Sequence, residues 1–235
     1  MAAVERVRSG DLGRVVAIDL AWNVDDPATW RREEEVAALH EADTDWKRFL
    51  LHLPEERFDP RKHLEFPLFW PYSSGIPDQW LSALIHMIPH VTGDPVPRSC
   101  VATGAIRFLK DGRRNPDAFT AVFDYPRGFQ VVFESRLRGA LPDIRESYAT
   151  ERATVDLRTG TVGLPGARPE EDHEPDAPAR PRIEEFLECV RTRRTPASDI
   201  ESGFAHSVAI CMAIEAFHAG KRIGYDAIKE KLIVF

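Results

Sequence analysis

The chain has 235 residues, of which 38 are acidic and 31 are basic, so its formal net charge at neutral pH is −7. A chain of this length can bury a substantial core without disulfide or metal staples. The acidic balance and the lack of a basic block argue against a nucleic-acid partner and against a polybasic membrane anchor.

The cysteines and the N-terminal residues indicate the compartment. Three widely spaced cysteines are odd in number, and Cys211 lies in apolar sequence, which is typical of free thiols in a reducing environment. Residues 1–13 carry charges where a signal peptide needs an apolar stretch, and no run reaches the roughly 18 apolar residues of a membrane span. We therefore expect a cytoplasmic protein with no membrane partner.

The first third of the chain combines two regular segments with a long irregular one. Residues 2–9 predict a short helix, and the apolar run at residues 15–22 predicts a buried strand. Residues 25–77 are irregular and rich in proline and aromatic side chains, with one helix expected at residues 45–53. Long irregular segments inside a compact domain often carry function or wrap a surface.

The middle of the chain predicts one helix followed by strands. Residues 78–88 place apolar side chains at three- and four-residue spacing, which indicates a helix. Pro89 should kink or end that helix, because proline cannot donate a hydrogen bond to the carbonyl four residues back. Strands are expected at residues 100–109, 118–125 and 129–137, the last two forming a hairpin.

The last third predicts a hairpin, a loop and more helices. The charged, proline-rich residues 165–182 predict a flexible loop. The other expected elements are a weaker hairpin at residues 146–157 and 161–164, helices at residues 183–193 and 200–218, and a tail at residues 225–235 made of a short helix and an apolar end. Residues 1–235 thus predict one α+β domain, a large open and mostly antiparallel sheet covered on one face by helices.

The segment at residues 77–93 contains two histidines four residues apart, His86 and His90, with Pro89 between them. Residues four apart on a helix can share a metal ion, but the proline disturbs the turn between them and the sequence marks no third ligand, so no metal ligand is assigned. The histidines can instead line a pocket at a helix end, or His86 can act as a general base. These interpretations stay open at this point.

Several stretches, taken together, resemble the second half of the Gfo/Idh/MocA oxidoreductases, the family of glucose-fructose oxidoreductase and inositol dehydrogenase. The resemblance runs through nearly the whole chain. The stretches are VERVRSGDLGRV, DTDWKRFL, FDPRKHLEFPLFWPYSSGIPDQW, KDGRRNPD and IEEFLECVRTRRTPASDIESGFAHSVA. The resemblance implies an α/β domain with a large open sheet that closes over a sugar or cyclitol and often builds the oligomer.

The dinucleotide-binding half of that family has no counterpart in this sequence. Met1 falls at the helix that, in the family, follows the Rossmann domain, and no Gly-x-Gly-x-x-Gly follows a strand. We therefore expect no cofactor within this chain, and NAD(P) only if a separate or upstream Rossmann domain supplies it. Such a domain on another chain would be a dinucleotide-binding partner.

The resemblance also changes the interpretation of the histidines. Related sequences carry a His-x-x-Asp pair on the helix after the Gly-Ile-Pro-Asp turn, and the histidine takes part in proton transfer. Aligned without gaps, that pair falls on Ala83 and His86. The usual histidine is therefore missing, and His86 stands where the carboxylate would be.

The candidate site residues follow from this comparison. Asp78 joins His86 as a catalytic candidate, because its turn resembles a substrate-facing loop; a carboxylate that stabilises a helix N-terminus is the plainer alternative. The expected substrate-binding residues are Tyr72, Gln79, Trp80 and His90, although aromatic side chains in this region also suit a packed cluster. His206 lies among apolar residues and favours a packing role over a ligand role, with a pocket position left open.

Three functions remain open. The first is a stand-alone domain that binds a carbohydrate-like small molecule or a partner chain and performs no hydride transfer alone. The second is a redox-neutral lyase, isomerase or hydrolase that uses His86, His90 and Asp78 as acid, base or metal ligands. The third is a self-associating protein, a homo-oligomer through its sheet. A truncated start of a full sugar dehydrogenase would explain the same sequence.

Overall fold

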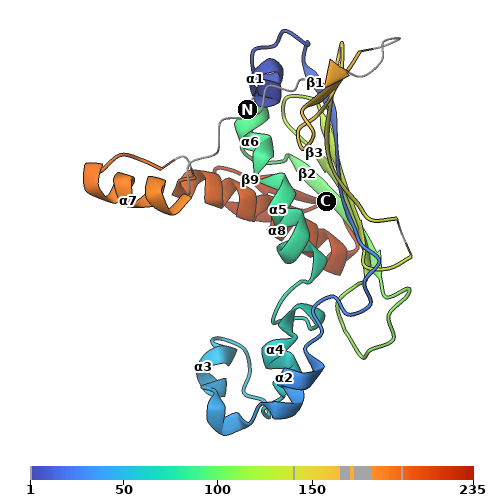
Figure 1. The fold of residues 1–235 in the computed structure, drawn as a ribbon, viewed down its shortest axis with the longest axis vertical. Coiled ribbons are helices and arrows are strands. Elements are labelled where there is room, and N and C mark those ends of the chain that lie inside the picture. Colours follow the sequence, from blue (N-terminus) through green and yellow to red (C-terminus); the bar gives the residue numbers. More distant parts are fainter. Residues whose placement is uncertain (1, 140, 165–169, 172–181, 197) are drawn as a thin grey trace.

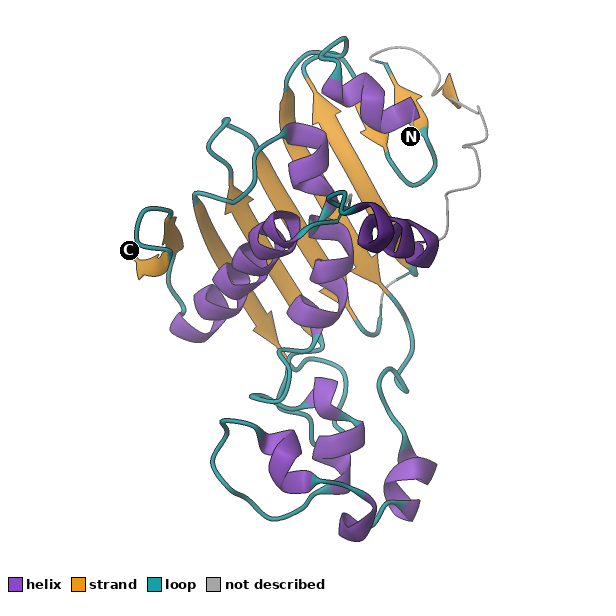
Figure 2. Cartoon of the chain, turned by 90° about the vertical axis from the view of Figure 1, so that its left-hand side faces the viewer, coloured by secondary structure: helices purple, strands orange, loops and turns teal. Residues whose placement is uncertain are grey.

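A computed structural model describes residues 2–139, 141–164, 170–171, 182–196 and 198–235. These residues build one large sheet with helices on one face and a separate helical lobe at one end (Figures 1 and 2). The expected α+β class and the one-sided arrangement of the helices are confirmed. The strand order is β10-β9-β2-β3-β4-β1-β5-β6-β7-β8.

Most neighbouring strands are antiparallel. Among the strands that the structure describes, β1 and β4 run parallel, and the other neighbouring pairs are antiparallel. The strands are β1 Val15–Asn23, β2 Ser99–Ala105, β3 Ala118–Asp124, β4 Gln130–Arg136, β5 Asp143–Thr150, β6 Thr154–Asp156, β7 Thr161–Gly163, β8 Glu170–Glu171, β9 Ile223–Asp226 and β10 Lys231–Val234.

The two faces of the sheet differ in side-chain size. Side chains alternate along a strand, so paired residues fall in rows across one face. The inner row of Cys100, Phe123, Val131, Ile18 and Tyr148 is fully buried. The outer face carries smaller and polar side chains in rows such as Val101, Val122, Val132, Asp19 and Ser147. The large inner side chains therefore need a helical cover.

That cover comes from the helices drawn in front of the sheet in Figure 2. Helix α8 packs against β2 and β9, and η3 and α5 pack against α8. Helix α7 projects away from the sheet (Figure 1). The helices concerned are α1 Ala2–Arg8, the π-helical turn η3 Pro77–Leu81, α5 Ser82–Ile85, α6 Met87–Thr92, α7 Arg182–Thr192 and α8 Ile200–Ala219.

Within the described part of the chain, α8 alone is long and apolar enough to cross a membrane by length and composition. Its position explains the composition, because Ala205, Ala209, Met212 and Ala213 are buried in the domain core. The apolar residues of α8 serve the packing of helix on sheet.

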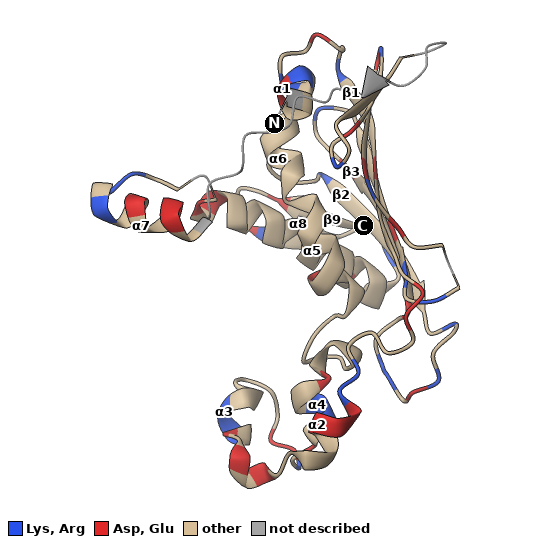
Figure 3. Ribbon diagram, in the orientation of Figure 1, with Lys and Arg blue, Asp and Glu red and all other residues tan. Residues whose placement is uncertain are grey.

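A helical lobe hangs from one end of the sheet, and acidic and basic residues lie on its helices (Figures 1 and 3). Its regular elements are α2 Glu33–Ala38, the 3-10 turn η1 Glu41–Asp43, α3 Trp46–Leu50, α4 Pro60–Leu64 and the 3-10 turn η2 Phe66–Leu68. The Asp45 side chain caps α3 by accepting a hydrogen bond from the backbone of Arg48 at 3.1 Å. The lobe corresponds to the long irregular segment of the sequence.

A buried carboxylate ties the lobe together. Glu65 is 1% exposed and accepts hydrogen bonds from Nε of Arg31 at 3.0 Å, Nε of Arg61 at 2.9 Å and the backbone of Arg32 at 2.9 Å. Burial pushes the pKa of Glu65 upward, but these three hydrogen bonds outweigh it and the pKa is lowered. Arg31 also reaches Asp111 at 3.6 Å, which connects the lobe to the loop between β2 and β3.

Some sequence predictions were wrong in detail. The tail forms the hairpin β9–β10 in place of a helix, because β9 pairs with β2 on the side that β3 leaves open. The strand expected at residues 100–109 ends at Ala105. Beyond it the backbone N–H groups of Arg107, Phe108 and Leu109 donate to the buried Asp117 carboxylate, which removes them from the ladder. The strand expected at residues 146–157 divides into β5 and β6.

The expected loop at residues 165–182 lies almost wholly outside the described residues. Within that range the structure describes β8 and the start of α7. The helices predicted at residues 183–193 and 200–218 are confirmed as α7 and α8. The Asp199 side chain caps α8, and Gly220 ends it with a left-handed backbone at φ 61°.

Replacing Glu146 by Gln should stabilise the protein at alkaline pH. Burial raises the pKa of Glu146 to about 7, although Tyr148 donates a hydrogen bond to Oε1 at 3.3 Å. A carboxyl pKa that is raised in the folded state contributes stability at low pH, and that contribution is lost as pH rises from about 4.5 to about 7. Urea unfolding should therefore show a gain of about 2–3 kcal/mol for E146Q at pH 8 and little change at pH 4.5.

Glu55, which is 81% exposed, supplies the control, and E55Q should show no such pH-dependent gain. An equal effect of E146Q at both pH values would contradict the assignment.

Replacing Glu65 by Ala should lower the free energy of unfolding by about 3 kcal/mol, because two arginines lose a buried partner. The control is Glu33, which contacts Arg31 at 2.7 Å but is 75% exposed, so E33A should cost less than about 1 kcal/mol. Chemical denaturation at neutral pH measures both. Similar losses for the two variants would show that burial of Glu65 is unimportant.

Candidate functional site

The turn before η3 is fixed by hydrogen bonds within itself. The Asp78 carboxylate accepts from the Ser73 hydroxyl at 2.9 Å and from the backbone of Ser74 at 3.0 Å. Gly75 has φ 71°, and a Cβ there would lie 3.0 Å from the carbonyl oxygen of Pro67, so glycine suits both the conformation and the space. Asn115 donates to the carbonyls of Pro67 and Ser73 at 2.9 and 2.8 Å.

The helix that leaves this turn is interrupted at His86. The prediction that it would kink or stop at Pro89 was wrong in position, because α5 ends at Ile85 and α6 runs through Pro89 to Thr92. Pro89 has no N–H to donate to the carbonyl of Ile85, and the interruption at His86 directly follows Ile85. The buried Ile85 and Ile88 hold this region against the core, so His86 lies at a defined irregularity.

His86 and His90 face α8 across a polar pocket of about 490 Å³. The pocket is lined by Ser82, Ala83, His86 and His90 from the first helical region and by Ser198, Asp199, Ser202, Gly203 and His206 from the start of α8. The ring centroids of His86 and His206 are 6.5 Å apart, with the rings edge to face. Residues about 120 positions apart in sequence thus form one surface.

The pKa values of two titratable groups in this pocket, His206 and Asp199, are both lowered. Burial lowers the pKa of His206, and a hydrogen bond with the backbone of Ser82 opposes this in part. Its Nε2 atom is buried and has no hydrogen-bond partner. The pKa of Asp199 is lowered by hydrogen bonds from the backbone and hydroxyl of Ser202 and, more weakly, by the charge of His90. At neutral pH the pocket combines a carboxylate with a neutral imidazole.

Asp78 and Gln79 do not line this pocket. Asp78 is engaged within its own turn, and Gln79 donates to Asp78 Oδ1 at 3.3 Å. The structure therefore places the two histidines together and leaves the carboxylate of Asp78 in the preceding turn. In this position Asp78 stabilises the start of the helical region.

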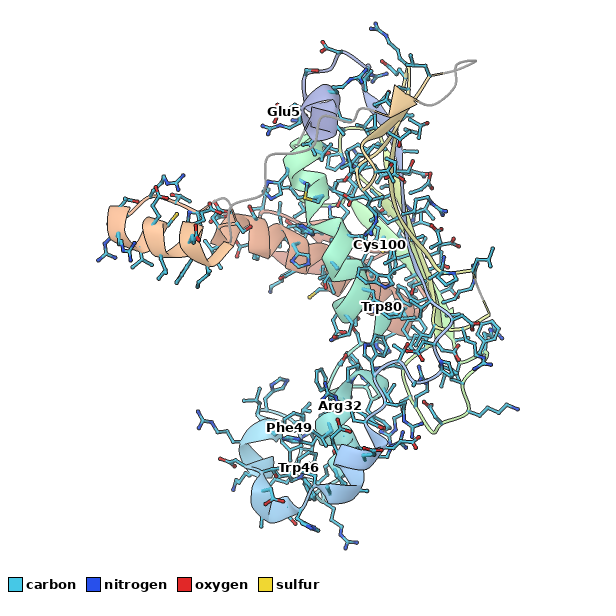
Figure 4. All side chains as sticks on the ribbon, in the orientation of Figure 1. Glu5, Arg32, Trp46, Phe49, Trp80 and Cys100 are labelled. Carbon is cyan, nitrogen blue, oxygen red and sulfur yellow. The ribbon has the colours of Figure 1, made fainter. Side chains whose placement is uncertain are left out.

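Tyr72 and Trp80 lie in two further environments. Trp80 is stacked on Trp22 at 5.7 Å and contacts Trp30 at 5.1 Å, so it connects the helix to β1. Tyr72 is stacked on Phe49 at 5.8 Å and lines a separate cavity of about 630 Å³ in the lobe. Figure 4 shows Trp80 between helix and sheet and Phe49 in the lobe, away from it.

Two titratable pocket residues, Asp199 and His206, were not predicted as site residues. The sequence favours Asp199 as a helix cap, which it is, and it favours His206 as a packing residue. The unpartnered Nε2 shows that the packing interpretation of His206 was incomplete. The signal in the sequence that could have identified His206 was a polar residue on the solvent side of an apolar helix. No group of three or more His, Cys, Asp or Glu side chains in the described part of the chain is arranged to hold a metal ion.

Comparison with known proteins identifies the fold. No protein-family model matches the sequence, and no curated protein matches it. Solved structures do match. An aldose-aldose oxidoreductase from Caulobacter crescentus, complexed with glycerol, has a TM-score of 0.64 at 17% identity over 94% of this chain and 59% of its own. A dehydrogenase from Bordetella pertussis, in complex with NADH and UDP-GlcNAcA, has a TM-score of 0.61 at 15% identity over 96% and 59%.

A third similar structure is UDP-N-acetylglucosamine 3-dehydrogenase from Acidithiobacillus ferrooxidans, with a TM-score of 0.55 at 15% identity over 92% of this chain and 58% of that one. The chain spans about 60% of the length of these oxidoreductases. At such identities the likeness shows the fold. It is the fold of Gfo/Idh/MocA-type oxidoreductases, as the sequence resemblance predicts, and the coverage is consistent with their C-terminal half.

Proposed function

We propose that this chain is a ligand-binding domain of the Gfo/Idh/MocA type that binds a carbohydrate- or cyclitol-like molecule in the pocket of His86, His90 and His206. The observation that carries the proposal is the pocket itself, about 490 Å³ in volume and lined by hydroxyl, imidazole and carboxylate groups. Such groups hydrogen-bond polyols, which carry a donor and an acceptor on each hydroxyl. Similar solved structures are named as complexes with glycerol and with UDP-GlcNAcA.

Hydride transfer, in this proposal, needs NAD(P) carried by another polypeptide unit. Dinucleotides are commonly held by a glycine-rich turn between a strand and a helix N-terminus. Among the described residues, Gly10 and Gly220 are glycines of positive φ that lie at helix C-termini, which is a different setting from a turn that leads into a helix. The chain alone would then bind ligand without oxidising it.

Ligand-observed NMR with glycerol, myo-inositol and D-glucose tests the proposal. We expect binding of at least one of the three, weakened about tenfold by the double variant H86A/H90A, because each lost hydrogen bond costs about 0.5–1.5 kcal/mol. His52, which lines the lobe cavity, gives the matched control, and H52A should bind as the unmodified protein does. Absence of binding, or a loss in H52A alone, would refute this pocket as the ligand site.

We further propose that the outer sheet face pairs with a second copy of the chain. No helix covers this face in the described part of the structure (Figure 1). Its row of Val101, Val122 and Val132 is flanked by Glu134, which contacts Arg136 at 3.2 Å and Arg145 at 3.5 Å. The row continues into Asp19 and Ser147, so the three adjacent valines form an apolar strip with polar neighbours that a partner can cover.

The substitution V122E tests this association. A buried unpaired carboxylate at the centre of the face should convert dimers or larger species to monomers, as measured by sedimentation velocity. Ile228, which is 95% exposed in the turn between β9 and β10, supplies the control I228E, which should leave the oligomeric state unchanged. A monomeric unmodified protein would contradict the proposal at once.

A further inference from the structure

His206 lines the pocket but belongs to an apolar helix. Its neighbours Ala205, Val208 and Ala209 are buried against the core, whereas His206 is half-buried and lines the pocket. The edge-to-face contact with His86 sets its ring at the seam between α8 and the α5–α6 region. The backbone of α8, a helix of 20 residues anchored on β2, therefore fixes its position.

The hydrogen bonding of His206 is half complete. One ring N–H is hydrogen-bonded to the backbone of Ser82, where the carbonyl oxygen is the acceptor. The other nitrogen, Nε2, is buried and has no partner. A buried polar atom without a partner loses its hydration without compensation, so native structures rarely leave one unless it has another use.

The charge state of His206 determines what Nε2 can bind. Burial favours the neutral ring, so with one N–H donated to Ser82 the Nε2 atom carries a lone pair and accepts hydrogen bonds. A ligand hydroxyl is a donor of the right size. Because Nε2 is shielded from solvent, the hydroxyl reaches it through a small adjustment of pocket side chains, of a kind that is common on binding.

We propose that His206 is a ligand-binding residue of this pocket, with Nε2 accepting a hydrogen bond from a hydroxyl group of a polyol ligand. This inference rests on the proposed function and deepens it, because it assigns a donor group of the ligand to a named acceptor. Asp199, the cap of the same helix, and His90 also line this pocket and bind other hydroxyls of the ligand. The pocket would therefore recognise a molecule with several hydroxyl groups close together.

The inference predicts that His206 contributes to the pH dependence of ligand binding. The titratable groups that line the same pocket are His86, His90 and Asp199, and all three remain in a His206 variant. Protonation of His206 removes its lone pair, so its contribution to polyol affinity should be lost as the pH falls. Gln at position 206 offers an oxygen acceptor that does not titrate over this range.

The experiment measures binding of glycerol, myo-inositol and D-glucose by NMR to the unmodified chain, H206A and H206Q, from pH 5.5 to pH 8. H206A should lose about 5- to 10-fold in affinity at pH 7, the cost of one hydrogen bond. H206Q should keep most of the affinity at pH 7. Its affinity should fall less at low pH than that of the unmodified chain, because glutamine does not titrate. His218, twelve residues along the same helix and in contact with Trp70 at 4.3 Å, gives the control H218Q, which should match the unmodified chain.

A measurement on the unmodified chain avoids reliance on variants that fold poorly. The ¹⁵N resonance of His206 Nε2 should shift when the polyol binds. If a polyol binds but H206A retains full affinity and this resonance does not move, the role of His206 is overturned and the proposed function stands. If none of the three polyols binds to the unmodified chain, the proposed function fails and this inference fails with it.

Discussion

The difference between the two faces of the sheet is the constraint on which the rest of the structure depends. Phe119, Phe123, Phe133 and Tyr148 all point to one side, and each is almost completely buried. A slip of one residue in any strand would turn its large side chains toward the opposite face. Because these aromatic groups must be covered, α8 and the η3–α6 region are drawn to the same face and meet there (Figure 2).

The polar pocket is a consequence of that meeting. Each helical region buries an apolar side, with Leu84 and Ile88 on one and Val208 and Met212 on the other. The residues that remain on the solvent side of the contact are histidines, serines and a capping aspartate. The pocket walls are therefore held by core packing beneath them, which leaves the polar groups preorganised for a ligand.

The sequence predicts the parts of this arrangement that have a local pattern. Alternation at residues 118–125 and 129–137 predicts the hairpin β3–β4, and Asp199 and Gly220 mark the ends of α8. Partners far apart in the chain leave no such pattern. The tail becomes a strand because β2 offers an edge, and His206 meets His86 because two helices cross on the sheet. Both outcomes depend on tertiary contacts that override local propensity.

The same reasoning explains why residues close in sequence have separate environments. Tyr72, Asp78, Trp80 and His86 lie within fifteen positions, yet the chain turns from the lobe through a hydrogen-bonded corner into the helical layer over this span. The lobe combines the ion pairs centred on Glu65 with an aromatic cluster around Trp46 and Phe49, whereas the helical layer is fixed by apolar burial against the sheet. The lobe cavity is lined largely by apolar and aromatic side chains such as Phe49 and Phe66, whereas the histidine pocket carries hydroxyl, imidazole and carboxylate groups. A ligand that needs several hydroxyls aligned at once should therefore select the histidine pocket.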